Sequence, residues 1–420
     1  MRIAMVSEHA SPLALITGED AGGQNVHVAE LATALARRGH DVVVHTRRTD
    51  PTAPDTVLFR DGVRVRHLTA GPAAPLAKDL LLPHMGEFER ALTEALAHER
   101  PDAVHAHFWM SGMAATGAGA ALGIPVFQTF HALGAVKQRF QGLADTSPPE
   151  RDRIEPAVAR TCDTVVATSE EERSELLTWG VAPERIAVVP CGVDTERFTR
   201  SGPGAPRNGR PRLLSLGRLV PRKGVDTVIR ALAAVTDAEL LVVGGPRTDE
   251  MRDDPEVVRL RTIARHLGVA DRVRFLGCVD RDEVPALVRS ADLSVNVPWY
   301  EPFGISTVES MACGVPVIAS RVGGHCDTVV HGETGLLVPA RSPGRLAEKI
   351  RMLLAEPDTR RFYSEASERR ARRRYSWSEV ARATEQCYRS QVPRAVLPRD
   401  PEHERLSGRT AATTVGGEES

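Results

Sequence analysis

Long apolar runs are scarce in this sequence of 420 residues. The longest, residues 112–127, is rich in Ala and Gly, contains Thr116 and Pro125, and is too short to span a bilayer. We expect it to form a buried helix followed by a strand. Near the amino terminus, the strand-like residues 2–6 run directly into Glu8 and His9, so no apolar core of a signal peptide forms there. A cytoplasmic protein without a transmembrane segment is expected.

Paired cysteines and excess charge are also lacking. The six cysteines stand singly, without a Cys-x-x-Cys pair, which argues against a disulfide scaffold or a zinc site and indicates buried residues in a reducing compartment. A formal net charge of −1 argues against a nucleic-acid-binding protein, which usually has a strong basic excess. An apolar content of 42% and a charged content of 26% are typical of a soluble globular protein. The cysteines are residues 162, 191, 278, 313, 326 and 387.

Lysine is scarce as well. Of 54 basic residues, four are lysine, and arginine is used almost everywhere else. A lysine kept in such a sequence marks a position where a compact ammonium group is wanted. Three of the four, Lys78, Lys137 and Lys223, fall in motifs discussed below.

What the sequence does contain is an alternation of apolar strands and amphipathic helices that occurs twice. Such alternation indicates parallel sheets covered on both faces. At 420 residues the chain is also too long for one ordinary core. The predicted fold is therefore α/β, with two doubly wound, Rossmann-like domains facing each other across a cleft, where ligands bind at the carboxyl ends of the strands. We expect a first domain at 1–200, a Gly/Pro/Arg-rich linker at 201–211, a second domain at 212–375, a last helix at 376–390 and a disordered tail at 391–420.

The individual elements follow from the same pattern. Strands are predicted at 3–7, 41–46, 63–68, 103–106, 126–129, 164–167 and 186–189 in the first domain, and at 213–216, 240–243, 273–276, 293–297 and 315–319 in the second. Helices of the first domain are predicted at 24–38, 84–98, 110–122, 150–161 and 170–178.

The most informative stretch is residues 298–316, PWYEPFGISTVESMACGVP. It follows an apolar strand, turns at Glu301 and becomes helical near Ile305, which places Glu309 about one turn inside the helix. Unpaired N–H groups at a helix start attract phosphate, whereas a carboxylate in the same turn is better suited to neutral hydroxyls. Phosphate and hydroxyls together indicate a sugar nucleotide. The alternative is an ordinary loop in which the glutamates decorate a helix start.

A second glycine-rich turn precedes the first helix. Gly22 and Gly23, in GEDAGGQ, let backbone amides approach an anion closely, although a plain flexible loop explains them equally well. The dinucleotide fingerprint G-x-G-x-x-G is missing from the residues that follow the first strand. Its absence disfavours a nicotinamide-dependent dehydrogenase.

Three histidines lie at or just after the ends of two strands of the first domain. His105 and His107, in HAHFWMSG, have no carboxylate or cysteine cluster near them in sequence, so they are interpreted as buried or cleft-lining imidazoles rather than metal ligands. His131, in TFHALGAVK, follows a strand directly and is placed with Gly134 and Lys137 at the edge of the cleft. The alternative for His131 is a core or capping histidine.

Five cations are candidates for contacts with anions. Arg218 and Lys223 lie between a strand and a helix, and a cation at a helix start is disfavoured unless an anion binds there. Lys78, Lys137 and Arg153 are candidates for an anionic acceptor, because charge-assisted bonds to phosphate are strong. Taken singly, each of these three is better explained as a solvated surface charge.

These motifs resemble those of the family-four retaining glycosyltransferases (group 1). The resemblance covers about residues 2–390 and rests on GGQNVHVAELATALARRGHDV, HAHFWMSG, TFHALG, LLSLGRLVPRKG, EPFG and VGGHCDTVVHGETGLLV. The first three are nearest to sucrose-phosphate synthases, and the acceptor-side cations are also similar to those of the transferase acting on inositol phosphate. One departure is Ser306-Thr307, where many relatives carry an apolar residue and Pro, which leaves the sugar selectivity open.

The resemblance implies a role for each motif. Glu301 would face the transferred sugar and Glu309 the nucleotide ribose, while Arg218 and Lys223 would neutralise the departing diphosphate. His131 would contact the transferred sugar, and Gln24 would help to frame the acceptor site. The implied catalytic residues are His131, Glu301, Lys223 and Arg218; the donor-binding residues are Gly22, Gly23, Arg218, Lys223, Glu301, Phe303, Gly304, Ile305 and Glu309; the acceptor-binding residues are Gln24, Lys78, Lys137 and Arg153.

The implied reaction moves a hexosyl group from a nucleoside diphosphate sugar, with UDP favoured, to a hydroxyl of a small sugar or polyol, which is phosphorylated in some relatives. In the front-face route proposed for the family, a leaving phosphate oxygen accepts the proton of the acceptor, so neither a metal nor a cofactor beyond the nucleotide sugar is expected. The alternatives are a sugar-nucleotide epimerase of the same architecture, a transferase to an unphosphorylated glycan or metabolite, and a non-catalytic nucleotide-sugar sensor. No nucleic-acid partner is expected, and the oligomeric state is not readable from the sequence.

Overall fold

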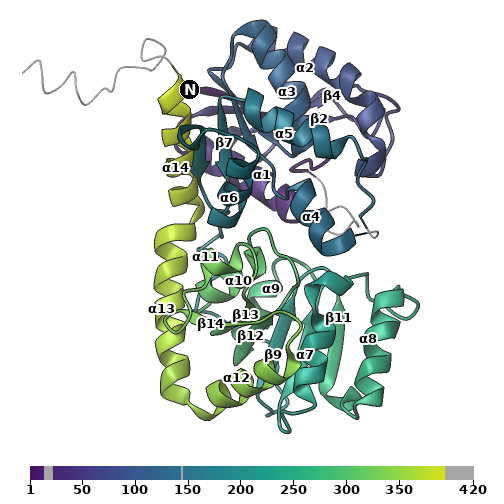
Figure 1. Cartoon of the computed structure of the whole chain (residues 1–420), viewed down its shortest axis with the longest axis vertical. Coiled ribbons are helices and arrows are strands. Elements are labelled where there is room, and N and C mark those ends of the chain that lie inside the picture. Colours follow the sequence, from purple (N-terminus) through teal and green to yellow (C-terminus); the bar gives the residue numbers. More distant parts are fainter. Residues whose placement is uncertain (14–21, 143–144, 393–420) are drawn as a thin grey trace, which may run out of the picture.

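The computed structural model describes residues 1–13, 22–142 and 145–392, and it contains two α/β domains stacked along the long axis of the molecule (Figure 1). The first domain is built on eight strands in the order β3-β4-β2-β1-β5-β6-β7-β8, with β3 antiparallel to β4 and the other pairs parallel. Its strands are β1 (Arg2–Val6), β2 (Asp41–Arg47), β3 (Thr56–Leu58), β4 (Arg64–Leu68), β5 (Ala103–His107), β6 (Val126–Thr129), β7 (Thr164–Ala167) and β8 (Ile186–Val188). Its helices are α1 (Gly23–Arg37), α2 (Met85–Glu99), α3 (Trp109–Leu122), α4 (Gly134–Gln141), α5 (Arg151–Thr161) and α6 (Glu170–Thr178).

The second domain is built on six parallel strands in the order β11-β10-β9-β12-β13-β14. Its strands are β9 (Arg212–Leu216), β10 (Glu239–Val243), β11 (Val273–Gly277), β12 (Leu293–Asn296), β13 (Val317–Ser320) and β14 (Gly335–Val338). Its helices are α7 (Val225–Leu232), α8 (Pro255–His266), α9 (Val284–Arg289), α10 (Ile305–Ala312), α11 (His325–Thr328), α12 (Pro343–Ala355) and α13 (Pro357–Tyr375). The prediction of two doubly wound α/β domains is confirmed.

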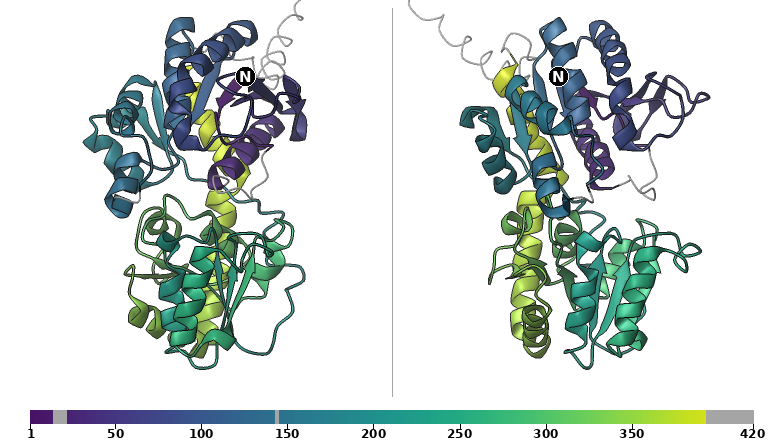
Figure 2. Two further views of the ribbon diagram at one scale, coloured as in Figure 1. Left: turned by 90° about the vertical axis from the view of Figure 1, so that its right-hand side faces the viewer. Right: turned by 45° about the vertical axis from the view of Figure 1, so that its right-hand side comes forward.

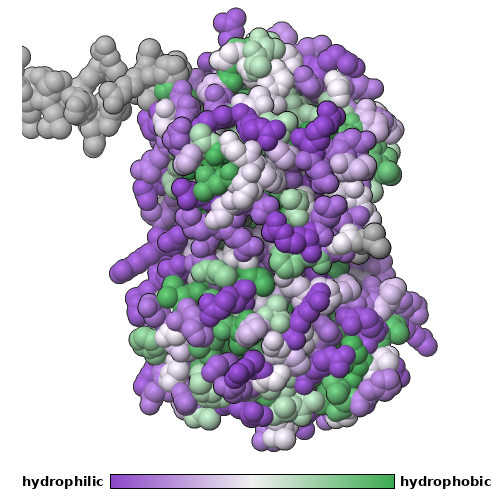
Figure 3. Space-filling model, in the orientation of Figure 1, coloured by the Kyte–Doolittle hydropathy of each residue, from purple (hydrophilic) through white to green (hydrophobic). Residues whose placement is uncertain are grey.

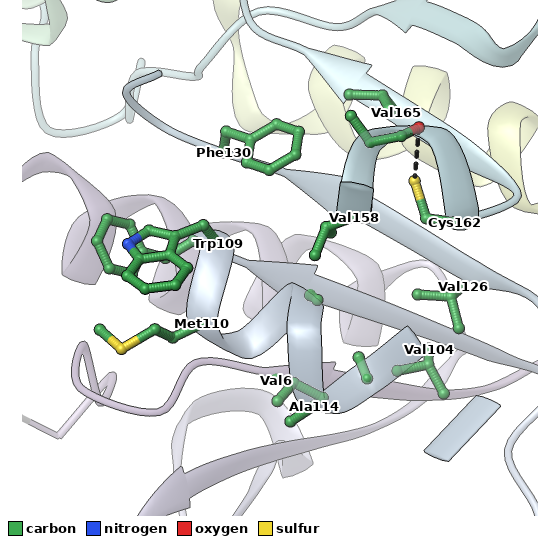
Figure 4. Packing of buried hydrophobic residues seen from close by; sticks show 14 of the residues in the cluster. Val6, Val104, Trp109, Met110, Ala114, Val126, Phe130, Val158, Cys162 and Val165 are labelled. Atoms are coloured by element: carbon green, nitrogen blue, oxygen red, sulfur yellow. Dashed lines mark hydrogen bonds between the residues drawn. The ribbon is translucent and has the colours of Figure 1, made fainter. Parts of the chain in front are cut away.

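Each sheet has apolar side chains on both faces because its central strands are buried on both sides. Every residue of β5 and β6 is buried, as expected for a parallel sheet covered by helices. One face of the first sheet packs against α2, α3 and α5, and Figure 4 shows Trp109 and Met110 of α3 in the same cluster as Val104, Phe130 and Val158. The opposite face packs against α1 and the last helix.

The last helix, α14 (Trp377–Gln391), leaves the second domain and lies against the first (Figures 1 and 2). Trp377 and Tyr388 enter the core of the first domain, and Arg38 of α1 forms an ion pair of 2.6 Å with Glu385. The chain therefore crosses between the domains a second time, next to the first crossing, where Val193 pairs with Ser376.

Some elements differ from the sequence predictions. The short strand β3, the helix α4 and the strand β14 were not predicted. The helix α13 was missed because it is charged on most of its surface and buries only five side chains. The predicted strand at 315–319 begins at Val317, and the predicted tail lies outside the described residues from 393 onward.

The cysteine prediction holds in part. All six cysteines are free, and Cys162, Cys191 and Cys313 are buried, whereas Cys326 is exposed on α11. The prediction of burial is thus wrong for Cys326, because α11 is a single turn that buries His325 and Thr328 and leaves Cys326 exposed. The face shown in Figure 3 is mostly hydrophilic, with apolar residues scattered over it. Within residues 1–13, 22–142 and 145–392, no helix is long and apolar enough to cross a membrane.

Candidate functional site

The domains meet where the carboxyl ends of both sheets face each other. A Cβ atom added to Gly23, at the start of α1, would lie 3.0 Å from Cδ1 of Ile305, at the start of α10. In a second contact between the domains, the backbone N–H of Glu170 donates to the Asp327 carboxylate at 2.7 Å. The amino-terminal ends of α1 and α10, one from each domain, are therefore close together across the cleft. Both carry unpaired N–H groups and partial positive charge.

Lys223 and Glu301 form the central ion pair of the second domain. Nζ of Lys223 lies 2.5 Å from Oε2 of Glu301, and both side chains are largely buried. Burial alone would raise the pKa of Glu301, but the Lys223 ammonium group lowers it to about 2, so the carboxylate is ionised at neutral pH. The pair lies in a cavity lined by Ser215, Leu216, Gly217, Arg218, Lys223, Val225, Val242, Asn296, Pro298, Glu301 and Ser306.

The turn that carries Glu301 depends on close backbone contacts. Gly304 has φ of 93°, and a Cβ atom there would lie 2.6 Å from the ring of His325. A Cβ atom on Gly323 would lie 2.0 Å from the carbonyl oxygen of Glu301, and the same carbonyl accepts from the N–H of Gly324 at 3.0 Å. These glycines permit the approach that no other residue would allow. They fix the backbone of Glu301 against α11.

The remaining predicted donor residues lie in α10 or just before it. The Phe303 side chain is buried inside the second domain against the Tyr375 ring, with 5.8 Å between centroids, so only its backbone can face the cleft. Glu309 is buried and binds Arg281 at 3.1 Å. Burial raises the pKa of Glu309, and Arg281 opposes that shift. Glu309 does not line the cavity that holds Glu301.

Gln24 and His131 occupy the facing side of the cleft. Nε2 of Gln24 donates to Oγ of Ser7 and to the backbone oxygen of His107, both at 3.3 Å. His131 follows β6 with φ of 64°, and its Nε2 lies 3.0 Å from Nδ1 of His107. His131 also lines a small cavity between the domains, together with Ala132, Leu133, Val136, Ser169, Glu171, Glu172, Tyr300, Pro302 and Gly323.

Tyr300 connects this cavity to the donor side. It precedes Glu301 in the second domain, yet its side chain is buried in the apolar cluster of the first domain. Its ring stacks on Phe140 of α4, with 5.5 Å between centroids and 10° between planes. Sequence reasoning missed this residue because nothing in the local pattern shows which domain an aromatic side chain enters.

The predicted acceptor-side lysines converge on one segment, residues 145–147. Lys137 binds Asp145 at 2.7 Å and Oγ of Ser147 at 3.0 Å. Lys78 lies 3.5 Å from Asp79, which accepts from the Thr146 hydroxyl at 2.6 Å. The structure therefore brings Lys78 and Lys137 to the same region of the first domain.

The arginine next to these lysines is Arg151 rather than Arg153. Arg151 is 2% exposed and donates to Oγ of Ser147 at 3.2 Å and to Glu155 at 2.9 Å. Arg153 is exposed on the same helix. The sequence contained both in RDRIEP, and only the rotation of α5 decides which of them points inward. Glu155 in turn accepts from the N–H of Gly134 at 2.6 Å, so Arg151 also supports the start of α4.

A polar pair directly after β1 was not assigned a role from the sequence. Glu8 is 1% exposed, accepts a hydrogen bond from the Ser111 hydroxyl, and lies 2.7 Å from Nδ1 of His9. The His9 ring packs edge-on against Phe108 at 4.7 Å, and the Arg151 guanidinium lies 5.2 Å from the same ring. Their position at the carboxyl end of a central strand is the signal that could have identified them.

Glu172 is a second acidic group that was missed. Its Oε2 accepts from the backbone N–H and the hydroxyl of Thr168, each at 2.7 Å, while Oε1 is buried without a partner among the described residues. Burial raises the pKa of Glu172 to about 7. The helix predicted at 170–178 is present as α6, but the sequence did not show that the Glu172 carboxyl group lines a cavity with His131.

The histidines and aspartates with metal-like spacing do not form a metal-binding group among the described residues. His105 and His107 are fully buried. Asp280 and Asp282 form an Asp-x-Asp pair, but the Asp282 side chain is exposed and binds Arg197 at 3.2 Å. Within the part of the chain that the structure describes, no group of three or more His, Cys, Asp or Glu side chains could hold a metal ion.

Two family models match the chain, one over each domain. The family model described as Glycosyltransferase Family 4 matches residues 21–197, and the model described as Glycosyl transferases group 1 matches residues 198–370. The chain is 35% identical over 407 residues to D-inositol 3-phosphate glycosyltransferase 2 of Catenulispora acidiphila, with 92% of this chain and 94% of the relative covered. It is 39% identical over 375 residues to D-inositol 3-phosphate glycosyltransferase of Acidothermus cellulolyticus, with 84% and 82% covered.

Structure comparison gives a consistent result. Sucrose-phosphate synthase from Thermosynechococcus elongatus superposes with a TM-score of 0.82 at 32% sequence identity. The superposition covers 93% of this chain and 98% of the other.

Proposed function

This chain belongs to the family 4, group 1 glycosyltransferases and has the two-domain GT-B fold, and on that premise we propose that it moves a hexosyl group from a nucleoside diphosphate sugar to a hydroxyl of a phosphorylated sugar or polyol, with retention of anomeric configuration. The observation that carries the proposal is the Lys223–Glu301 pair, which shares one cavity with Arg218 at the cleft. A cavity with two cations and one ionised carboxylate suits a ligand that is anionic at one end and carries hydroxyls at the other.

The diphosphate is assigned to the cationic end. As the bond from the anomeric carbon to the diphosphate breaks, negative charge accumulates on the leaving oxygen. Arg218 and Lys223 stabilise that charge electrostatically, and the N–H groups at the start of α10 and at Gly22 and Gly23 add to the effect. UDP is the donor nucleotide that we favour.

The sugar is assigned to the space between Glu301 and His131. Glu301 is ionised and accepts hydrogen bonds from hydroxyls of the transferred sugar, and His131 approaches the sugar from the first domain. Glu309 is assigned to the ribose hydroxyls, and Arg281 holds its carboxylate in place until the donor binds.

The acceptor phosphate is assigned to the region of Lys78, Lys137 and Arg151. These three cations surround residues 145–147, where Lys137 binds Asp145 and both Lys137 and Arg151 donate to the Ser147 hydroxyl, groups that a phosphate can replace. The relatives named above are a transferase for D-inositol 3-phosphate and a sucrose-phosphate synthase, and the chemistry common to both names is a sugar or polyol phosphate.

The acceptor hydroxyl attacks on the face from which the diphosphate leaves. The bond from its oxygen to the anomeric carbon forms as the bond to the leaving phosphate oxygen breaks, and that phosphate oxygen takes the hydroxyl proton. All bonds and the proton of this transfer are accounted for without a metal and without a cofactor beyond the nucleotide sugar.

A nucleotide-release assay tests the proposal. The purified chain is given UDP-glucose, UDP-N-acetylglucosamine, ADP-glucose or GDP-mannose, each with and without fructose 6-phosphate or inositol phosphate. We expect release from one donor that rises at least about tenfold with a phosphorylated acceptor. Donor conversion that is independent of every acceptor would instead support an epimerase or an unphosphorylated acceptor.

A further inference from the structure

His131 is the last of three histidine rings that lead from the last helix through the interior of the first domain. Nδ1 of His105 lies 2.7 Å from the Tyr388 hydroxyl of α14. The His105 ring packs on His107 at 4.3 Å between centroids, and His107 stacks on His131 at 5.2 Å. His105 and His107 are fully buried, and His131 reaches the cavity between the domains.

All three rings are neutral at pH 7. Burial lowers the pKa of His105 to about 3, and it lowers the pKa values of His107 and His131 well below their usual value. A neutral imidazole carries one N–H donor and one bare acceptor nitrogen, so each hydrogen bond restricts where the proton lies.

The tautomer of His105 follows from its partners. The Thr129 hydroxyl donates its only proton to the backbone oxygen of Val166, at 3.1 Å, so towards His105 it can act only as an acceptor. Nε2 of His105, at 2.9 Å, is therefore the protonated nitrogen, and its Nδ1 accepts from the Tyr388 hydroxyl.

The contact between His107 and His131 allows two arrangements. In the first, Nδ1–H of His107 donates to Nε2 of His131, and the proton of His131 is on its Nδ1. In the second, Nε2–H of His131 donates to Nδ1 of His107, and the proton of His107 is on Nε2. That Nε2 atom of His107 is buried and has no partner among the described residues. The second arrangement therefore leaves a buried N–H group without an acceptor, which is rarer in proteins than an under-satisfied acceptor.

We propose that His107 is a positioning residue that fixes His131 in the tautomer with the proton on Nδ1, so that His131 presents a hydrogen-bond donor rather than a base to the ligand between the domains. No described residue forms a hydrogen bond with Nδ1 of His131, and Nε2 is engaged by His107. This inference rests on the proposed function, because the ligand is then the transferred sugar. A donor at this position stabilises electron-rich sugar oxygens and leaves the acceptor proton to the leaving phosphate.

Two-bond ¹H–¹⁵N correlation spectra of histidine-labelled protein test the tautomer without any substrate. His131→Gln identifies the His131 signals by their loss. The chain supplies two internal standards, because His105 has its proton on Nε2, and His325 is buried, neutral and directs Nδ1 at the backbone oxygen of Ser320 at 3.3 Å. We expect His131 to show the His325 pattern. A His131 signal with the His105 pattern would overturn the proposal.

Two variants separate positioning from packing. His107→Phe keeps a ring between His105 and His131 but removes the donor, and we expect it to shift His131 towards the Nε2–H pattern and to lower kcat about tenfold with little change in acceptor KM. His107→Asn can again supply an N–H near the Nδ1 position, and we expect it to restore the His131 pattern and part of kcat. An unchanged His131 pattern in His107→Phe would refute the role of His107. The spectra remain decisive even if none of the tested donors is a substrate, so failure of the proposed function is recognised separately.

Discussion

Nζ of Lys223 lies 2.5 Å from Oε2 of Glu301, and the two residues follow β9 and β12, which are neighbours in the second sheet. The pair therefore belongs to the edge of the sheet at which parallel α/β domains bind ligands. Its partly buried position makes each charge dependent on the other, which gives the first prediction.

Replacing either partner of this pair is expected to slow transfer strongly. Lys223→Ala removes a cation from the leaving diphosphate, and Glu301→Gln keeps the shape of the side chain but removes its charge. We expect each to lower kcat/KM by at least about a hundredfold, the scale of one lost transition-state contact in a preorganised site. Lys349→Ala is the matched control, because Lys349 is a surface lysine bound to Glu348. Steady-state kinetics with the preferred donor measures the effect, and near-normal turnover in both variants would remove the donor-site assignment.

The Tyr300 side chain is expected to couple domain closure to the donor site. Tyr300→Ala removes an aromatic ring that is buried across the cleft against Phe140, so the closed arrangement loses about 3 kcal/mol of packing. We expect a larger radius of gyration in small-angle scattering and a lower kcat/KM for donor and acceptor alike. The control is Phe362→Ala, which truncates an exposed phenylalanine on α13. A scattering profile identical to that of the unmodified protein would show that Tyr300 is not part of the closure.

Replacing an acceptor-side cation is expected to raise the KM of the acceptor but not that of the donor. Lys137→Met removes the charge beside residues 145–147, and we expect the KM of the phosphorylated acceptor to rise about tenfold while the KM of the donor stays the same. Arg153→Ala, an exposed change on α5, serves as the comparison and is expected to have a smaller effect. Equal effects on donor and acceptor KM would place Lys137 outside the acceptor site.

Arg151 differs from Lys137 and Arg153, because its replacement also destabilises the fold. Arg151→Ala leaves Glu155 buried without its cation, and breaking such a pair costs about 3 kcal/mol or more. We expect a clear drop in the temperature of unfolding for Arg151→Ala and none for Arg153→Ala. Thermal unfolding followed by circular dichroism distinguishes the two variants. Equal unfolding temperatures would mean that the Arg151–Glu155 pair does not contribute to the stability of the fold.

The buried imidazoles are expected to make the first domain sensitive to acid. Burial lowers the pKa of His27 from 6.5 to about 4, so the unfolded chain binds this proton more readily between these values. The contribution of neutral His27 to the free energy of unfolding is therefore fully present above pH 6.5 and is lost as the pH falls towards 4. His27→Phe keeps the ring contacts with Trp377 and His131 but removes the titration.

Between pH 7.5 and pH 5, the free energy of unfolding of His27→Phe is consequently expected to rise by about 2 kcal/mol relative to that of the unmodified protein. One pKa unit corresponds to about 1.4 kcal/mol. Urea unfolding at both pH values measures the difference. Burial raises the pKa of Glu172, which contributes the opposite slope, so the comparison between variants is more informative than the absolute curve. The same difference in stability at both pH values would contradict the prediction.

Much of the fold could be predicted because each element carries its own signal. The apolar strands and amphipathic helices of both domains can be predicted from the local sequence, and so can the turns at Gly23 and Gly304. Because parallel strands bring their carboxyl ends to one edge of the sheet, these turns are expected to lie at that edge. The approach of Lys223 to Glu301 follows from that rule even though 78 residues separate them.

The rest depends on contacts that no local pattern reveals. The rotation of α5 decides whether Arg151 or Arg153 points inward, and a helix of 11 residues with a proline inside gives little periodicity to judge by. The bond between His105 and Tyr388 spans 283 residues and exists only because α14 returns to the first domain. The entry of Tyr300 into the core of the other domain depends in the same way on how the domains meet.

A time course of the complete reaction by ¹H NMR tests the central claim most directly. The preferred nucleotide sugar is mixed with the phosphorylated acceptor and the unmodified protein, and the anomeric signals are followed as nucleotide is released. The account predicts that a new glycosidic anomeric signal with the configuration of the donor grows in step with the free nucleotide. An inverted glycoside, free sugar alone, or an isomerised nucleotide sugar without any glycoside would contradict it.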